Sequence, residues 1–179
     1  GNGFLDSEEG VSESADMDGD GTPDYKDTDT ASVRHAKGLS NIRLRCSAGD
    51  FRQIQALDET DPALNQTGKP TGRLFPYGAL RFSITGLTPG QTVTVDIEMP
   101  DNVPTNATFY KILSTGWTLL ELGSNNGDKV ITLTLTDGDP NTDLDGVANG
   151  TIVDPGVLTM PAAGSGDSDD DSCFIQSMF

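Results

Sequence analysis

Alternating aspartates near the N-terminus are the residues best suited to chemistry. Asp16, Asp18 and Asp20 precede Gly21, and the run closes at Asp27. Three alternating carboxylates on a looped backbone can turn inward onto one hard cation, and a glycine at the sixth position allows the sharp bend of a twelve-residue calcium loop. The spacing therefore predicts a Ca2+ site rather than a solvated acidic turn. Its expected ligands are Asp16, Asp18, Asp20, the carbonyl of Thr22, Asp24 and Asp27.

The residues from 16 to 29, DMDGDGTPDYKDTD, resemble the thrombospondin type 3 repeat. Members of that family bind calcium in compact loops with little regular structure, through aspartates at these spacings. The resemblance implies that Asp29 begins the coordination of a further ion.

Residues 1–9 look like the second half of another calcium loop. With Gly3 at the sixth position, Phe4 would offer its carbonyl, and the side chains expected to bind are those of Asn2, Asp6 and Glu9. The first and third ligands would precede the start of the chain. Either a longer precursor was cut inside a repeat, or a neighbouring molecule supplies those oxygens. The alternative is an acidic terminus without a bound ion.

A second alternating set follows residue 136. Asn141, Asp143 and Asp145 precede Gly146, but the twelfth position is Ile152, whose side chain cannot coordinate a cation. Asn149 occupies the ninth position, and Asp137, Asp139 or Asp154 would have to complete the shell. The pattern favours a second calcium site, with an acidic turn stabilised by Asx hydrogen bonds as the alternative.

Composition points to the same class of ligand. The 179 residues include 28 Asp and Glu but only 11 Lys and Arg, which gives a formal net charge of -17. This charge disfavours nucleic acid and anionic membranes as partners, and it favours cations. No apolar run approaches the roughly 18 residues that a membrane span needs.

The predicted location is extracellular, on a bacterial cell surface. Free calcium is abundant outside cells, and the chain starts at Gly1, so we expect a secreted, trimmed product. Cys46 and Cys173 are compatible with one disulfide in that setting, and equally with two buried thiols.

Apolar and polar residues alternate in several segments, and this period of two is typical of half-buried antiparallel strands. With 21 Gly and 10 Pro providing turns, the sequence predicts an all-β fold, an antiparallel two-sheet β-sandwich of the Ig or jelly-roll kind. The expected strands lie at 42–46, 80–84, 93–97, 109–113, 117–122 and 131–135. The expected domains are a calcium-binding segment at 1–32, a linker at 33–38, the sandwich at 39–161, a Gly/Ser/Asp spacer at 162–172 and an apolar tail at 173–179.

The sandwich sequence itself resembles a bacterial surface domain, the choice-of-anchor U family. The resemblance is carried by residues 75–95, 110–111, 116–117, 133–138 and 145–156. Members of this family are secreted and often follow thrombospondin type 3 repeats, and related proteins often carry a Cys-Phe-Ile tail that leads toward an anchor. Here the tail departs from that pattern after Ile175. The resemblance implies an exported surface protein and supplies no activity.

The tail contains large apolar side chains that need a place to be buried, namely those of Phe174, Ile175, Met178 and Phe179. We expect these residues, with Cys173, to dock on a neighbouring copy as an added strand. The alternative is a frayed terminus.

An enzyme is not expected, because His35 is the single histidine and no nucleophile motif surrounds it. The sequence instead predicts a calcium-binding structural subunit of an extracellular bacterial filament or appendage, a homo-oligomer or homopolymer. The alternative is a surface-displayed, calcium-stabilised adhesin or carbohydrate-binding module. Trp117 lies in a strand-like stretch, where core packing is its expected role.

Overall fold

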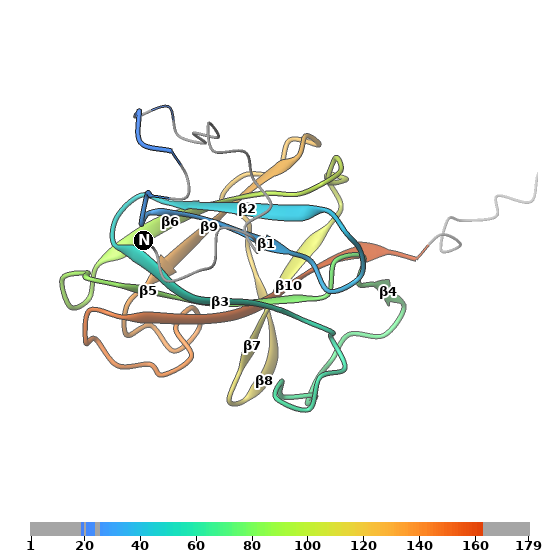
Figure 1. Cartoon of the computed structure of the whole chain (residues 1–179). Coiled ribbons are helices and arrows are strands. Elements are labelled where there is room, and N and C mark those ends of the chain that lie inside the picture. The colour runs from blue at the N-terminus through green and yellow to red at the C-terminus, as the bar shows by residue number, and fades with distance from the viewer. Residues whose placement is uncertain (1–18, 20, 24–25, 163–179) are drawn as a thin grey trace, which may run out of the picture.

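The computed structural model describes residues 19, 21–23 and 26–162, which contain ten strands and no helix (Figure 1). The strands are β1 (Thr30–Arg34), β2 (Asn41–Cys46), β3 (Asp50–Leu57), β4 (Arg73–Leu74), β5 (Ala79–Thr85), β6 (Thr92–Glu98), β7 (Thr108–Leu113), β8 (Gly116–Leu120), β9 (Val130–Thr136) and β10 (Ile152–Pro161). Within the described part of the chain, no helix is long and apolar enough to cross a membrane.

The strands form two antiparallel sheets that pack face to face. One sheet has four strands in the order β1-β2-β6-β9, and the other has six, in the order β3-β5-β10-β7-β8 with β4 paired to β10. In Figure 1 the four-stranded sheet lies above β3, β5 and β10. This arrangement confirms the predicted all-β fold and the antiparallel two-sheet sandwich.

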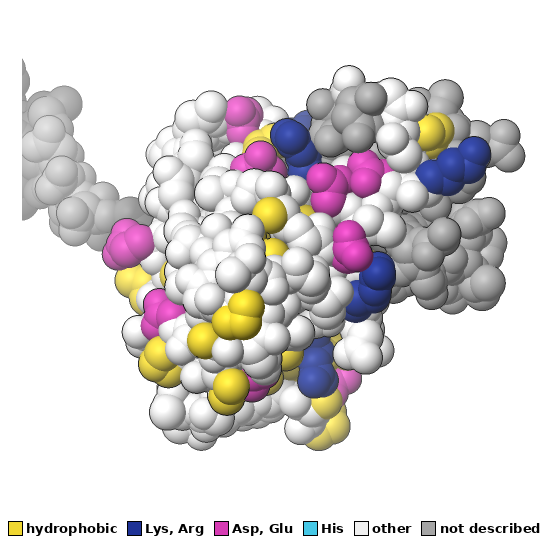
Figure 2. All heavy atoms as spheres, turned by 90° about the vertical axis from the view of Figure 1, so that its left-hand side faces the viewer, with side chains coloured by type: hydrophobic (Ala, Val, Ile, Leu, Met, Phe, Trp, Pro, Cys, Tyr) yellow, Lys and Arg dark blue, Asp and Glu magenta, His cyan; other side chains and the backbone are white. Residues whose placement is uncertain are grey.

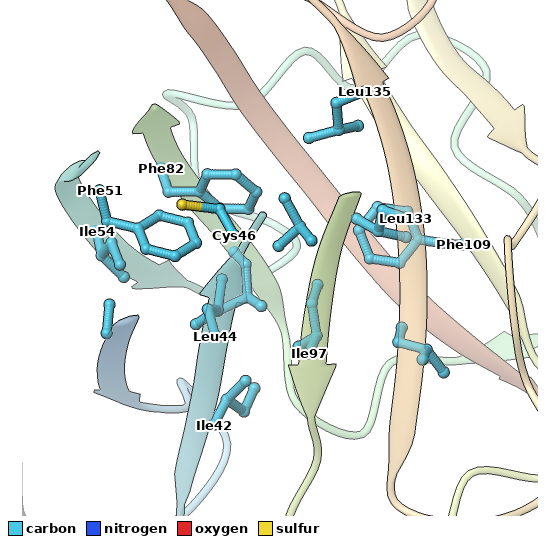
Figure 3. Close-up of a cluster of buried hydrophobic side chains, with 14 of the residues drawn as sticks. Ile42, Leu44, Cys46, Phe51, Ile54, Phe82, Ile97, Phe109, Leu133 and Leu135 are labelled. Carbon is cyan, nitrogen blue, oxygen red and sulfur yellow. The ribbon is translucent and has the colours of Figure 1, made fainter. Parts of the chain in front are cut away.

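The core fills the space between the two sheets, because alternate residues of each strand point into it. Leu44, Ile97 and Leu133 enter from the four-stranded sheet and are fully buried (Figure 3). From the other sheet, the rings of Phe51 and Phe82 meet edge to face, with their centroids 5.5 Å apart. The alternation read from the sequence therefore places the right residues inside.

Strand β10 lies at the centre of the six-stranded sheet, although its sequence shows no alternation. It is covered on both faces, because a second apolar cluster that includes Ile112, Trp117 and Val157 covers the outer face. Pro155 is tolerated in this central strand where β10 pairs with Arg81 of β5 and pairing with β7 has not yet begun.

The sandwich begins earlier than the sequence indicated. All of β1 pairs with β2, from Thr30 opposite Arg45 to Arg34 opposite Asn41. The strand spans the expected boundary between the calcium-binding segment at 1–32 and the linker at 33–38. The sheet therefore starts at Thr30 rather than at residue 39. Small side chains are buried here, and they give little apolar signal in the sequence.

Candidate calcium sites and the buried acidic loop

The N-terminal loop reaches the described part of the chain only at its C-terminal end. Thr22, Asp27 and Asp29 are described, and so is Gly21, the residue at the sixth position of the loop. The other predicted ligands lie outside the described residues, and these are Asn2, Asp6, Glu9, Asp16, Asp18, Asp20 and Asp24. The tail residues Cys173, Phe174, Ile175, Met178 and Phe179 also lie outside them.

Gly21 has the backbone conformation that the sixth position of a calcium loop needs. Its φ is +92°, in the region that glycine adopts without steric cost and other residues rarely adopt. The described backbone at this position therefore fits the sharp bend predicted from the spacing.

Asp27 offers an oxygen that a cation would satisfy. Its Oδ1 accepts a hydrogen bond from the N–H of Asp29 at 3.3 Å. Its Oδ2 is buried and has no hydrogen-bond partner among the described residues. Burying a carboxylate oxygen without a partner is costly, and a hard cation such as Ca2+ is one group that removes this cost. The residue at the twelfth position of the loop therefore fits a calcium ligand.

The end of this loop is fixed against both sheets. The hydroxyl of Thr28 donates to Oδ1 of Asp50 at 2.7 Å, and the N–H of Phe51 donates to the carbonyl of Thr28 at 2.7 Å. On the other side, the N–H of Cys46 donates to the carbonyl of Asp29 at 2.9 Å. An ion held by Asp27 would therefore order the chain where it enters β1, between β2 and β3.

The carboxylate of Asp137, a predicted ligand of the second site, accepts hydrogen bonds from the backbone. The N–H groups of Gly90 and Gly150 donate to its Oδ2 at 2.8 and 3.0 Å, and those of Asn149 and Thr151 donate to its Oδ1 at 3.3 and 3.2 Å. Burial alone would raise the pKa of Asp137, but these four hydrogen bonds outweigh it and lower the pKa. Four N–H donors use the acceptor capacity of a carboxylate, so Asp137 does not fit a calcium ligand.

Asp143 also faces the protein. It is 1% exposed, and its Oδ1 and Oδ2 each accept a backbone N–H at 3.0 Å, from Val153 and Gly138 respectively. Burial raises the pKa of Asp143, with the N–H groups opposing the rise and the charge of Asp145 adding to it. This side chain ties the acidic loop to the start of β10.

The other acidic side chains of the loop make local bonds. Oδ1 of Asp139 accepts from the N–H and the side-chain amide of Asn141, while Asp145 accepts from the N–H of Val147 and the side-chain amide of Asn149. The described residues contain no group of three or more His, Cys, Asp or Glu placed to hold a metal ion. These bonds match the alternative interpretation, an acidic loop stabilised by Asx hydrogen bonds.

Asp154, another predicted ligand of the second calcium site, forms an ion pair with Lys111 inside the sandwich, and both side chains are 0% exposed. Lys111 belongs to none of the sites predicted from the sequence. The spacing could have indicated its burial. Lys111 lies two residues from Phe109 and two from Leu113 in β7, so its side chain points to the same inward face as theirs.

Cys46 is a buried thiol in the main core. It is 1% exposed, its Sγ–H donates to the carbonyl of Gly49 at 3.3 Å, and burial raises its pKa to about 12. A thiol with so high a pKa is unreactive at neutral pH. Cys173 lies outside the described residues, so the choice between one disulfide and two buried thiols stays a prediction.

One cavity of about 130 Å³ lies beside Leu64, Ile112 and Leu144, with Arg81 as its one charged lining residue. This volume is below the roughly 300–1,000 Å³ of most ligand sites, whereas a second hollow, beside Leu119, has about 320 Å³. The side chain of His35 packs edge to face against Tyr77 instead of reaching this cavity.

Comparison of the chain with protein-family models, curated proteins and solved structures returned no significant match.

Proposed function

We propose that this protein is a non-enzymatic, calcium-binding structural subunit of an extracellular bacterial filament or surface appendage. The observation that carries the proposal is the buried, unpartnered Oδ2 of Asp27, at the point where the aspartate-rich loop joins both sheets. Further support comes from the net charge of -17 and from the resemblances to thrombospondin type 3 repeats and choice-of-anchor U domains. Figure 2 shows acidic side chains spread among basic and apolar ones on one face of the sandwich.

Calcium in this proposal stiffens the entry to the sandwich. Asp27 contributes the closing carboxylate, and Asp16, Asp18, Asp20 and Asp24 contribute the others. The bound ion relieves repulsion between these carboxylates and satisfies the buried oxygen of Asp27. The segment before β1 then forms a rigid connection, which suits a subunit that carries load between neighbours.

Calcium is expected to raise the stability of the whole protein, and replacing both Asp18 and Asp20 by alanine should abolish the effect. Ligand binding stabilises the folded state by about 2.7 kcal/mol when free calcium is about 100 times Kd. Calorimetric titration measures the uptake, and thermal unfolding with and without chelator measures the stabilisation. Asp101→Ala, at an exposed position away from the loop, is the matched control and should bind like the wild type. Absence of calcium uptake by the wild-type chain would refute the site.

Assembly in this proposal uses an open sheet edge. Strand β8 ends the six-stranded sheet and pairs only with β7 among the described strands, but at its start the N–H of Trp117 donates to the carbonyl of Thr67 at 2.9 Å. The proposed acceptor edge is therefore the rest of β8, at 118–120. Its residue Leu119 is 50% exposed, beside a surface hollow of about 320 Å³ lined in part by Thr105 and Leu122. An edge strand presents unpaired N–H and C=O groups, and an added strand gains backbone bonds and side-chain pockets together. We assign the apolar tail at 173–179 of a neighbouring copy to this edge.

Deletion of residues 173–179 should abolish polymerisation while leaving the sandwich folded. Burial of four large apolar side chains contributes roughly 1.5–3 kcal/mol each before ordering costs, so their loss removes most of the contact. Electron microscopy at millimolar calcium compares the deletion with the full chain, and chelator should disperse the assemblies. Leu119→Lys tests the acceptor edge separately. Polymers formed equally well by the truncated chain would exclude the tail as donor.

The carbohydrate-binding alternative has less support. Trp117, the single tryptophan, is 8% exposed, and its indole N–H donates to the carbonyl of Asn65 at 2.6 Å. Its ring contacts Phe75 edge to face, with centroids 5.7 Å apart. The ring therefore serves the outer apolar cluster and leaves little surface on which a sugar could stack.

A further inference from the structure

Lys111 and Asp154 form an ion pair in a part of the molecule where charges are expensive. Lys111 lies on β7, Asp154 lies on β10, and neither side chain is exposed. Lys111 Nζ contacts Oδ1 of Asp154, and among the described residues neither group has a hydrogen-bond partner outside the pair. Burial costs several kcal/mol per ion, and no further hydrogen bonds from the described residues offset that cost here. A pair of this kind needs an explanation other than stability as an ion pair.

The packing forces the two groups together. Lys111 lies opposite Gly156 in the register of β7 and β10, and Asp154 is the diagonal neighbour on the same inward face. A Cβ at Gly156 would lie 2.3 Å from the Phe109 ring and 3.3 Å from Oδ1 of Asp154. The absence of a side chain at Gly156 therefore lets the ring close over the pair and exclude water.

A third buried group acts on both partners. Asp143 is held at the start of β10 by the N–H groups of Val153 and Gly138, and its charge acts on Lys111 and on Asp154. Burial lowers the pKa of Lys111, with the two carboxylates opposing the shift. Burial likewise raises the pKa of Asp154, which Lys111 opposes. Both shifts favour a neutral amine beside a neutral carboxylic acid, which are the forms that condense to an amide.

We propose that Lys111 and Asp154 join covalently, through an amide bond between Nζ of Lys111 and Cγ of Asp154. The Nζ lone pair attacks Cγ, a C–N bond forms, and the C–O bond to one oxygen breaks. Nζ gives up one proton, which leaves with that hydroxyl as water, while the nearby charge of Asp143 acts on both groups. No oxidant, reductant or cofactor is needed. Fixed proximity in a dry site supplies the drive, since held groups react as if at very high concentration.

The bond would raise the mechanical force that the sandwich resists before β7 and β10 separate. It links β7 to β10, the central strands of the six-stranded sheet, and replaces two buried charges by one neutral amide. Neighbouring strands could then no longer separate under tension without breaking a covalent bond. The inference stands on the geometry of the pair and does not depend on calcium or on assembly.

Mass spectrometry of the purified full chain tests the proposal directly. The expected intact mass is lower than the sequence mass by one water molecule, and digestion should yield a branched peptide that contains both residue 111 and residue 154. Lys111→Met should have its full sequence mass. Lys129→Met, which removes an exposed lysine, should keep the loss. Asp154→Asn should lose ammonia in place of water.

Two further variants complete the test. Should Lys111→Met fold poorly, the double variant Lys111→Met/Asp154→Leu fills the same space with apolar groups and should show its full mass. Asp143→Asn should slow or prevent the mass loss, which a merely structural role would not do in folded protein. A folded wild-type chain at its full mass would overturn the proposal. So would a water loss that persists in Lys111→Met, because dehydration elsewhere would then explain it.

Discussion

Replacing Asp137 by alanine should lower the free energy of unfolding by about 3–5 kcal/mol, since a buried donor left without a partner costs about 1–3 kcal/mol and the change removes the acceptor of four N–H groups. Water entering the vacated space will recover part of the loss. The effect should be the same in calcium and in chelator, because the carboxylate binds backbone rather than metal. Urea unfolding followed by the fluorescence of Trp117 measures it.

Asp139→Ala is the matched control for that change. Asp139 belongs to the same acidic loop, but its side chain accepts hydrogen bonds only from Asn141 in its own turn, so replacing it should cost no more than about 1 kcal/mol. A large loss for Asp137→Ala that appears only in calcium would contradict the hydrogen-bond explanation and support the predicted second calcium site.

The stability contributed by Asp137 should depend on pH with a definite sign. Hydrogen bonding lowers its folded pKa below the ordinary value of 3.8. Its contribution is therefore present above that value and is lost as the pH falls through the folded pKa. The difference in stability between wild type and Asp137→Ala should be full near neutral pH and should shrink below pH 3.8. A difference that grows on acidification would have the wrong sign.

The strands that could be predicted from the sequence are those with one buried face. In β6 and β9, for example, apolar and polar residues alternate strictly, and the structure buries the apolar set. Strand β10 could not be predicted in this way, because both of its faces are covered and its sequence lacks the alternation that marks a half-buried strand. In β3 the register shifts between Arg52 and Gln55, where Gln53 has a φ of +54°, and this bulge breaks the period of two.

The candidate sites show why spacing alone is insufficient. Both acidic loops carry the same alternating pattern before a glycine. In the second loop, however, the carboxylates of Asp143 and Asp137 accept hydrogen bonds from the N–H groups of Val153 and Gly90, which lie 10 and 47 residues away in the sequence. Such bonds depend on the closure of the sandwich, and no local pattern announces them. Lys111 was missed for a different reason. Its inward parity was readable, but a lysine is seldom buried without its partner, and the sequence did not connect it to Asp154.

Replacing Gly156 by alanine should destabilise the protein by about 3 kcal/mol or more, at the upper end of what overpacking costs. The added methyl would lie 2.3 and 2.5 Å from two carbons of the Phe109 ring, which is 1% exposed and cannot swing into solvent. Strand β10 has partners on both sides at this point, so its backbone cannot move away either. Gly156 does not have a positive φ, and the loss would therefore be steric rather than conformational.

Two variants separate the steric cause from other effects of adding a methyl group. Gly86→Ala places a Cβ in open space at a φ of +80°, and should lose only the roughly 1–2 kcal/mol of left-handed backbone strain. The double variant Gly156→Ala/Phe109→Leu removes the ring carbons that the methyl meets. It should be less destabilised than the sum of the two single changes, as expected for residues in contact. Strict additivity in urea unfolding would show that Phe109 is not what Gly156 makes room for.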